Sequence, residues 1–294
     1  MTGDFSNKNV LVTGASSGIG YQAALDLAGK GAYVIGTGRD VTRCEAARTR
    51  ILQVHPEAQI EYLVADLASQ TQIHELARQA QLLLKEHGNR LDVLVNNAGL
   101  YSSKRVLTED GIELTFAVNH LAPFLLTHLL LPQLLNTPQG RVLGVSSQSH
   151  YHAFLSPLKA YRPWLYLSLP VYATSNLCRV LFSAEFNRRT PTPHLHAWSV
   201  DPGLVNTEIG QKDKGFLSNL VWRFRKTHGT SAEIPSQTIL HLAFSAFHYI
   251  AADLYWKDSR PKEPSRLSRD AELAKRLWEQ SCRLCGIDDY FNPG

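Results

Sequence analysis

The sequence is poor in cysteine and in net charge, and it contains no long hydrophobic run. Four cysteines in 294 residues are too few for a disulfide scaffold in a chain of this length. Lys and Arg number 30 against 26 Asp and Glu, so the formal net charge of +4 is too small and too dispersed to indicate nucleic-acid binding. No stretch approaches the roughly 18 apolar residues of a membrane-spanning helix, and no secretory segment opens the chain. We therefore expect a soluble, cytoplasmic protein in a reducing compartment, with no membrane anchor before its first strand.

Short apolar runs alternate with longer helical patterns over the first 200 residues. Apolar residues make up 44% of the chain, which is enough for a substantial core. The predicted strands are 9–13, 32–37, 60–64, 91–95, 141–146 and 195–200, and the predicted helices are 19–30, 41–54, 70–87, 110–135 and 171–189. This alternation predicts an α/β fold, a doubly wound Rossmann-type sheet of parallel strands with helices on both faces. We expect one domain over residues 1–294.

The rhythm weakens over residues 201–294. Residues 214–226 form a basic amphipathic stretch, and helices are predicted at 231–250 and 269–285, separated by a charged segment at 257–269. We expect residues 201–294 to carry a substrate lid and a C-terminal extension. The stretch 214–226 is the expected lid, which could also rest on a membrane surface; a plain packing helix is an equally good interpretation.

A glycine-rich segment joins the first predicted strand to the first predicted helix. Its glycines permit a tight turn and close approach of a diphosphate to backbone N–H groups, and the helix dipole favours that negative charge. A tight turn without a ligand is the weaker interpretation. The residues expected to bind the dinucleotide are Gly14, Ser16, Ser17, Gly18, Ile19 and Gly20.

The end of the second predicted strand bears on the choice of dinucleotide. A site for NAD commonly has a carboxylate here to hold the ribose hydroxyls, whereas this strand ends in Thr37 and Gly38, followed by Arg39. A guanidinium suits the 2′-phosphate of NADP, so we expect NADP and regard NAD as the weaker candidate. Asp40 leaves a second interpretation open, because it could neutralise Arg39 or bind the ribose itself.

Further along, a series of short motifs follows the predicted strands. They are TGASSGIG at 13–20, Asp66-Leu67, Asn96-Asn97-Ala98-Gly99, Asn119, Ser146-Ser147, Tyr172 in YATSN, and Asp201-Pro202-Gly203 with Thr207. In this order and spacing they resemble the short-chain dehydrogenase/reductase family over residues 9 to about 250. SSQSH, NLCRVLF and the tail LAKRLWEQSCRLCGI are most similar to the branch of retinol dehydrogenases and the WW-domain oxidoreductase.

This resemblance implies an oxidoreductase acting on a small-molecule alcohol or carbonyl, in this branch a lipophilic one. It implies that Ser147 orients the substrate oxygen, that Tyr172 is the general acid/base, and that Asn119 holds a water for proton relay. The remaining positions that it assigns to the cofactor site are Asp66, Leu67, Asn96, Ala98, Gly99, Tyr172, Pro202, Gly203 and Thr207. A homodimer is a candidate assembly.

One position departs from the family pattern. Four residues after Tyr172, where the family has a lysine, this chain has Asn176. A nearby cation favours the phenolate form of a tyrosine, and asparagine supplies no charge. Arg179 is two turns away from Tyr172, and we assign it no replacement role. The alternative function is therefore a catalytically impaired dinucleotide-binding protein that acts through partner binding, and an inactivating change at residue 176 is a third interpretation.

Two other patterns indicate little chemistry. Cys282 and Cys285 have the spacing of metal ligands, but no second pair accompanies them, so we expect no metal. His150 and His152 are expected to be solvated loop histidines.

Overall fold

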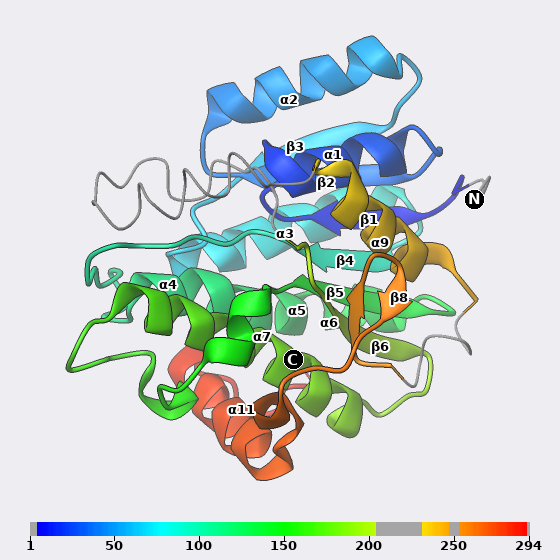
Figure 1. The fold of residues 1–294 in the computed structure, drawn as a ribbon. Helices are drawn as coiled ribbons and strands as arrows, with labels where there is room; N and C mark the ends of the chain where they lie inside the picture. Colours follow the sequence, from blue (N-terminus) through cyan, green and yellow to red (C-terminus); the bar gives the residue numbers. More distant parts are fainter. Residues whose placement is uncertain (1–4, 204–230, 247–252, 293–294) are drawn as a thin grey trace.

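Parallel strands form the centre of the molecule in the computed structural model, which describes residues 5–203, 231–246 and 253–292 (Figure 1). The described residues form an eight-stranded sheet in the order β3-β2-β1-β4-β5-β6-β7-β8. Its strands are β1 (Asn9–Val12), β2 (Tyr33–Gly38), β3 (Ile60–Val64), β4 (Val93–Asn96), β5 (Gly140–Val145), β6 (Leu195–Val200), β7 (Tyr255–Lys257) and β8 (Arg260–Pro261). All neighbouring strands are parallel except β7 and β8, so the predicted doubly wound fold is confirmed.

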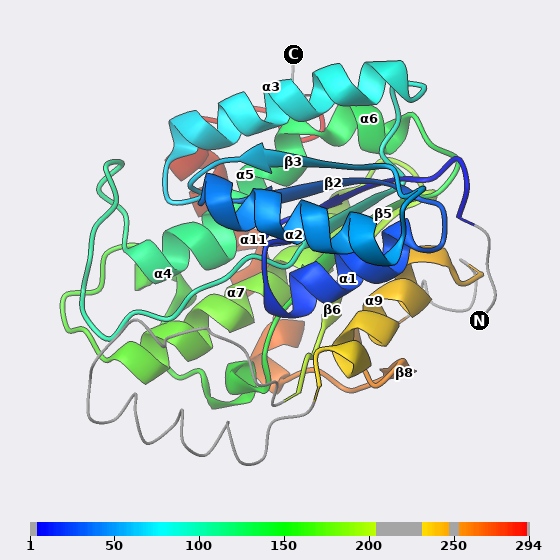
Figure 2. The same ribbon diagram turned by 90° about the horizontal axis from the view of Figure 1, so that it is seen from above.

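Helices cover both faces of this sheet (Figure 2). One face is covered by α1 (Gly18–Ala28), α2 (Val41–Val54) and α9 (Glu233–Phe244); the other is covered by α3 (Gln70–Glu86), α5 (Ala122–Leu129), α6 (Leu131–Leu135), α7 (Ser168–Arg189) and α11 (Ala271–Cys285). Val10 and Val12 of β1 pack with α1 and α9, and Leu11 between them packs with α3 and α5. Burial on both sides explains why these strands are apolar at every position.

The predicted helix at 110–135 is wrong as one element. The structure divides it into α4 (Leu114–Phe116), a π-helical turn at Ala117–Leu121, α5 and α6. Pro123 and Pro132 lie in the first turns of α5 and α6, where the missing N–H is tolerated but the preceding helix cannot continue regularly. The π-helical turn carries Asn119, and turns of this kind are often found at functional sites.

The segment beyond residue 253 also differs from the sequence prediction. β7 pairs with β6, and β7 and β8 form a small hairpin that begins just before the segment expected to be merely charged, 257–269. Asp258 and Ser259 at its tip both have positive φ, as type I′ hairpin turns require. Two short 3-10 turns, Gln148–His152 and Pro157–Lys159, follow β5, and a third, Arg266–Arg269, precedes α11. The predicted helix at 231–250 is observed as the shorter α9.

Candidate functional site

The glycine-rich turn between β1 and α1 leaves no room for side chains. Gly14 and Gly18 have positive φ of 67° and 57°. A Cβ on Gly14 would lie 3.0 Å from Cα of Ala98, and a Cβ on Gly20 would lie 2.4 Å from both Nδ2 of Asn97 and the carbonyl oxygen of Gly14. Ser17 is the N-cap of α1 but makes no side-chain capping hydrogen bond, unlike the N-caps of α2 and α3. The tight turn at an uncapped helix start suits an anionic diphosphate.

The same turn is hydrogen-bonded to the segment that follows β4. Nδ2 of Asn97 donates to the carbonyl oxygen of Thr13 at 2.8 Å, and the backbone N–H of Ala98 donates to Oγ1 of Thr13 at 3.0 Å. Nδ2 of Asn96 donates to Oγ1 of Thr127 at 3.1 Å. Two motifs that lie about eighty residues apart in the sequence are therefore in direct contact, at the carboxyl edge of the sheet, where doubly wound folds bind ligands.

At the end of β2, Arg39 and Asp40 are exposed. The Asp40 carboxylate caps α2 by accepting a hydrogen bond from the backbone N–H of Arg43 at 3.0 Å. A Cβ on Gly38 would lie 3.1 Å from Oγ of Ser16, so the Ser16 side chain reaches the end of this strand.

After β3, the two expected cofactor residues differ in their surroundings. Oδ1 of Asp66 accepts from the backbone N–H of Ala68 at 3.0 Å, whereas Leu67 packs in the hydrophobic core.

Ser147 and Tyr172 lie on adjacent segments. Ser147 follows β5, and its Oγ accepts from the backbone N–H of Ser149 at 3.2 Å in the 3-10 turn that packs against α7. Tyr172 is half-buried in the first turns of α7, with its ring edge-to-face against Tyr101 at 5.9 Å between centroids. The Tyr172 hydroxyl makes no hydrogen bond to another described residue.

Asn176 and Asn119 both direct their side chains to nearby protein groups. Nδ2 of Asn176 donates to the carbonyl oxygen of Tyr172 at 2.9 Å, within its own helix. The Asn119 amide exchanges two hydrogen bonds with the backbone of Leu100, at 2.8 and 2.9 Å, and Nδ2 also donates to Oγ of Ser175 at 2.9 Å. Oγ of Ser175 in turn donates to the carbonyl oxygen of Tyr172 at 2.8 Å. The expected relay water of Asn119 remains a prediction.

The side chain of Arg179 was not expected to belong to the site, but it lies within it. The residue is 5% exposed, and its guanidinium donates to the carbonyl oxygens of Asn119, at 2.5 Å, Val145 and Ala98. Burial lowers the pKa of Arg179 to about 10, still well above neutral, and the charge of Tyr172 acts in the opposite direction. The available signal was its position on the helix, seven residues after Tyr172 and on roughly the same face.

The segment after β6 is only partly described. The N–H of Gly203, which has a φ of 69°, donates to Oδ1 of Asp201 at 2.9 Å, and Lys262 forms an ion pair with Asp201 at 2.8 Å. Gly203 follows Pro202 in this turn. Thr207 and the expected lid at 214–226 lie outside the described residues.

The prediction for His150 is wrong, whereas His152 is exposed as expected. His150 is 1% exposed; its Nδ1 lies 2.8 Å from the carbonyl oxygen of Ser147, and its Nε2 accepts from the backbone N–H of Ser265 at 3.2 Å. Burial lowers its pKa, which favours the neutral ring. Ser265 lies 115 residues along the chain, where local sequence patterns give no indication of this contact.

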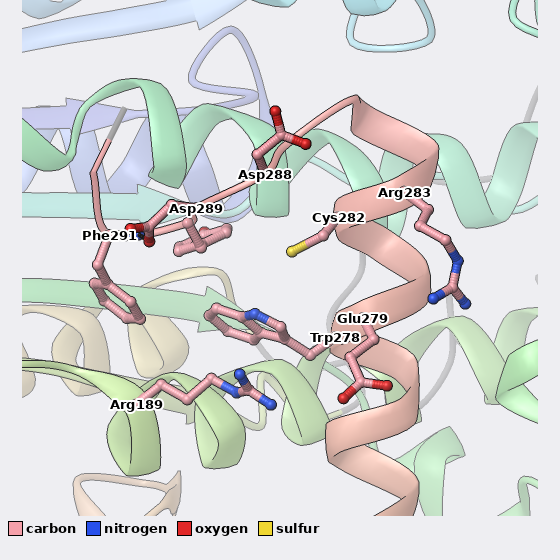
Figure 3. A pocket seen from close by; sticks show the side chains of 9 residues that line it. Arg189, Trp278, Glu279, Cys282, Arg283, Asp288, Asp289 and Phe291 are labelled. Atoms are coloured by element: carbon pink, nitrogen blue, oxygen red, sulfur yellow. Dashed lines mark hydrogen bonds between the residues drawn. The ribbon is translucent and has the colours of Figure 1, made fainter. Parts of the chain in front are cut away.

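A cavity of about 490 Å³ lies away from these residues, between the end of α7, α11 and the segment after α11. Figure 3 shows Arg189, Trp278 and Cys282 among its side chains. Burial raises the pKa of Cys282 to about 11 and that of Cys285 to about 12, so both thiols are protonated at neutral pH. Within the described ranges, no group of three or more His, Cys, Asp or Glu residues could hold a metal ion.

Comparison with known proteins gives consistent matches over nearly the whole chain. The family model described as short chain dehydrogenase matches residues 8–215. Human retinol dehydrogenase 13 is 34% identical over 291 residues, covering 96% of this chain and 85% of that protein. The chicken WW domain-containing oxidoreductase is 33% identical over 294 residues, covering 96% and 69%. A crystal structure of an uncharacterised protein from Mycobacterium Paratuberculosis superimposes with a TM-score of 0.73 at 28% identity, covering 97% and 95%.

Proposed function

The chain belongs to the short-chain dehydrogenase family, in the branch of the retinol dehydrogenases and the WW domain oxidoreductase, and we propose that it interconverts a lipophilic alcohol and its carbonyl compound with NADP. Oxidoreduction of alcohols and carbonyls is the activity of this family. One observation carries the assignment to a site: the glycine-rich turn is bonded directly to Asn97 and Ala98, on the same sheet edge as Ser147 and the start of α7.

The proposed roles follow from the groups at this edge. A nicotinamide dinucleotide, when bound, supplies or accepts the hydride. The turn from Gly14 to Gly20 would hold its diphosphate, and Asn96 to Gly99 would line its floor. Ser147 would hold the substrate oxygen, and Tyr172 would donate or accept the proton there, because charge develops on that oxygen as the carbonyl is reduced.

The preference for NADP is supported by Arg39. Its guanidinium is exposed directly after β2, and the neighbouring Asp40 carboxylate caps α2 rather than being paired with Arg39 in the structure. The Arg39 guanidinium is then available to bind the 2′-phosphate of NADP. We also propose Asp66, Leu67, Pro202, Gly203 and Thr207 as further cofactor contacts.

A lipophilic substrate is supported by apolar side chains between the turn after β5 and the start of α7. Phe154, Trp164 and Leu165 are 70%, 90% and 53% exposed. We propose that this surface and residues 214–226, which lie outside the described residues, receive such a substrate and contact a membrane peripherally. No described helix is long and apolar enough to cross a membrane. We also propose a reducing, cytoplasmic location, which the four unpaired cysteines support. We propose a homodimer as the assembly.

Asn176 favours a second candidate function, a dinucleotide-binding protein without turnover. Its side chain bonds to its own helix and brings no charge to Tyr172. One experiment separates the two functions: titration of NADPH and NADH into the protein, followed by assays on a panel of lipophilic alcohols and carbonyls over a wide pH range.

We expect tighter binding of NADPH and measurable turnover that falls in Ser147→Ala. NADPH binding without turnover on any substrate at any pH would favour the second function.

A further inference from the structure

A buried cation lies in the proposed site without an acidic partner. The Arg179 residue is 5% exposed, and none of the ion pairs among the described residues includes it. Burying a charge without a counter-charge is costly, and it is tolerated only where other polar groups satisfy it. Here the guanidinium is satisfied by carbonyl oxygens of the backbone alone. Arg141 is buried and bonded to carbonyl oxygens in a similar way, so a function for Arg179 has to follow from the segments that its carbonyl partners belong to.

The three carbonyl groups belong to three separate segments of the proposed site. Ala98 is in the cofactor floor after β4, Val145 ends β5 two residues before Ser147, and Asn119 lies in the π-helical turn. The planar fork of an arginine can bond several oxygens at once, which a lysine ammonium does less rigidly. Arg179 therefore fixes these segments relative to one another and to α7.

The position of Arg179 on α7 brings its charge near Tyr172. Long side chains in a helix tilt toward the N-terminus, so a residue seven positions after Tyr172 extends back along the face that carries it. A Cβ on Gly99 would lie 3.2 Å from the Arg179 guanidinium and 3.3 Å from Oδ1 of Asn119, so both side chains reach the segment after β4. Burial lowers the pKa of Arg179, and the charge of Tyr172 raises it. Attraction between two charges is mutual and strengthens where water is excluded.

The other titratable groups around this pair do not replace that charge. His120, in the π-helical turn, is fully buried, and burial together with Arg179 lowers its pKa to about 3, so it is neutral. Burial also favours neutral His150 in the turn after β5. Tyr101, from the loop after β4, contacts Tyr172 by its ring, and Cys178 on α7 is buried, with a raised pKa. Arg179 is the cation that remains among these neighbours.

We propose that Arg179 supplies the positive charge beside Tyr172 that Asn176 lacks, and that it acts as a positioning residue for proton transfer at Tyr172. The proposal rests on the proposed function, because it concerns the same tyrosine. In this arrangement the charge is that of the Arg179 guanidinium, which the backbone carbonyl oxygens of the site hold in place. The presence of asparagine rather than lysine at residue 176 then does not by itself make the protein inactive.

The test follows ionisation of Tyr172 in the protein without cofactor. Each protein and its Tyr172→Phe counterpart are titrated with base while ultraviolet absorbance is recorded. The difference between the two curves shows the absorbance change as the Tyr172 hydroxyl loses its proton, and we call this change the Tyr172 step. We expect Arg179→Met to move the step to higher pH by about one unit or more, and Arg179→Lys to move it much less. Adding Asn176→Lys to Arg179→Met should restore it.

Arg141 offers a matched control. It is 3% exposed and donates to the carbonyl oxygens of Leu242 and Ser245, at 2.5 and 2.7 Å, but it lies at the opposite end of β5 from Ser147. Arg141→Met should destabilise the protein without moving the Tyr172 step. An unmoved step in a folded Arg179→Met protein overturns the proposal.

Should Arg179→Met fail to fold, Arg179→Gln takes its place, and an unmoved titration step in that folded variant overturns the proposal. Turnover is measured separately. A Tyr172 step that shifts in Arg179→Met, without turnover by the wild type, would reject the proposed enzyme and leave the role of Arg179 intact. Tyr172-dependent turnover with an unmoved step would support the enzyme and reject the role of Arg179.

Discussion

Two buried charged residues at opposite ends of the central strands, Asp92 and Arg179, differ in how their charge is compensated. At the amino edge, Asp92 is 2% exposed and accepts hydrogen bonds from Lys8 at 3.1 Å and Thr137 at 3.0 Å, with Arg90 3.5 Å away. Its charge is matched by two cations that remain partly solvated. Such a network joins β1, β4 and the segment before β5, and its role is structural.

At the carboxyl edge, Asp201 pairs with Lys262 at 2.8 Å, but Arg179 and Glu113 have no opposite charge as a partner among the described residues. Arg179 is bonded to carbonyl oxygens, and Glu113, which is 0% exposed, accepts from the backbone N–H of Phe116 at 2.8 Å while the Tyr166 hydroxyl lies 3.3 Å from its other oxygen. Burial raises the pKa of Glu113. Because Asp92 joins structural segments and Arg179 lies in the proposed site, we expect variants of Asp92 to lose stability and variants in the site to lose turnover.

The largest effect is expected at Tyr172. Tyr172→Phe removes the proton donor and acceptor while keeping the ring, so turnover should fall by about 10²- to 10⁴-fold or more. The unfolding temperature should change little, and NADPH affinity, to which the Tyr172 hydroxyl is also expected to contribute, should fall far less than turnover. Steady-state rates, thermal unfolding and cofactor titration of the same preparation measure all three. Unchanged turnover would show that another group transfers the proton.

At the amino edge the balance should reverse. Asp92→Ala leaves the buried backbone N–H of Asn9 and the Thr137 hydroxyl without their acceptor, and it should lower the free energy of unfolding by about 1–3 kcal/mol. Urea denaturation measures this loss, and Glu57→Ala, at an exposed acid, is the control. NADPH affinity of the folded fraction should be unchanged. A large loss of NADPH affinity with little loss of stability in Asp92→Ala would contradict the structural role of Asp92.

The sequence predicted the parts of the molecule whose signals are local. The apolar strands and the helices between them gave the sheet, and α2, β3 and β6 have the predicted bounds. The glycine-rich turn and Asn96 to Gly99 are in contact because β1 and β4, the strands they follow, are neighbours in the sheet.

What the sequence did not predict depends on contacts between distant segments. The interruption at Pro123 and Pro132 had local signals, but the π-helical turn at Asn119 depends on packing against α7. The β7–β8 hairpin was hidden by its charged composition, and Ser265 contacts His150 from 115 residues away. Arg179 was set aside because helical spacing alone does not show how far back a long side chain reaches.

A smaller effect is expected where the cofactor choice is made. Arg39→Ala should weaken NADPH binding by about ten- to a hundredfold, equivalent to roughly 1.5–3 kcal/mol for a charge-assisted contact. NADH affinity should stay the same, because NADH has no 2′-phosphate. Calorimetric titration of both dinucleotides measures the difference, with Lys85→Ala, at an exposed cation on α3, as control. Equal affinities of the wild type for NADPH and NADH would refute the preference.

The smallest effect concerns the dependence of stability on pH. Because burial raises the pKa of Glu113 in the folded state, its contribution is fully present below the unfolded value of about 4.3 and is lost as pH rises through the folded value. The loss amounts to about 1.4 kcal/mol for each unit by which the pKa is raised. Glu113→Gln keeps the accepting oxygen but not the charge, so its unfolding temperature should decline less between pH 4 and pH 8 than that of the wild type. Glu272→Gln, at an exposed position on α11, should follow the wild-type curve. Identical curves for Glu113→Gln and the wild type would mean that Glu113 is compensated after all, and that Arg179 alone of these two residues holds a charge without a counter-charge.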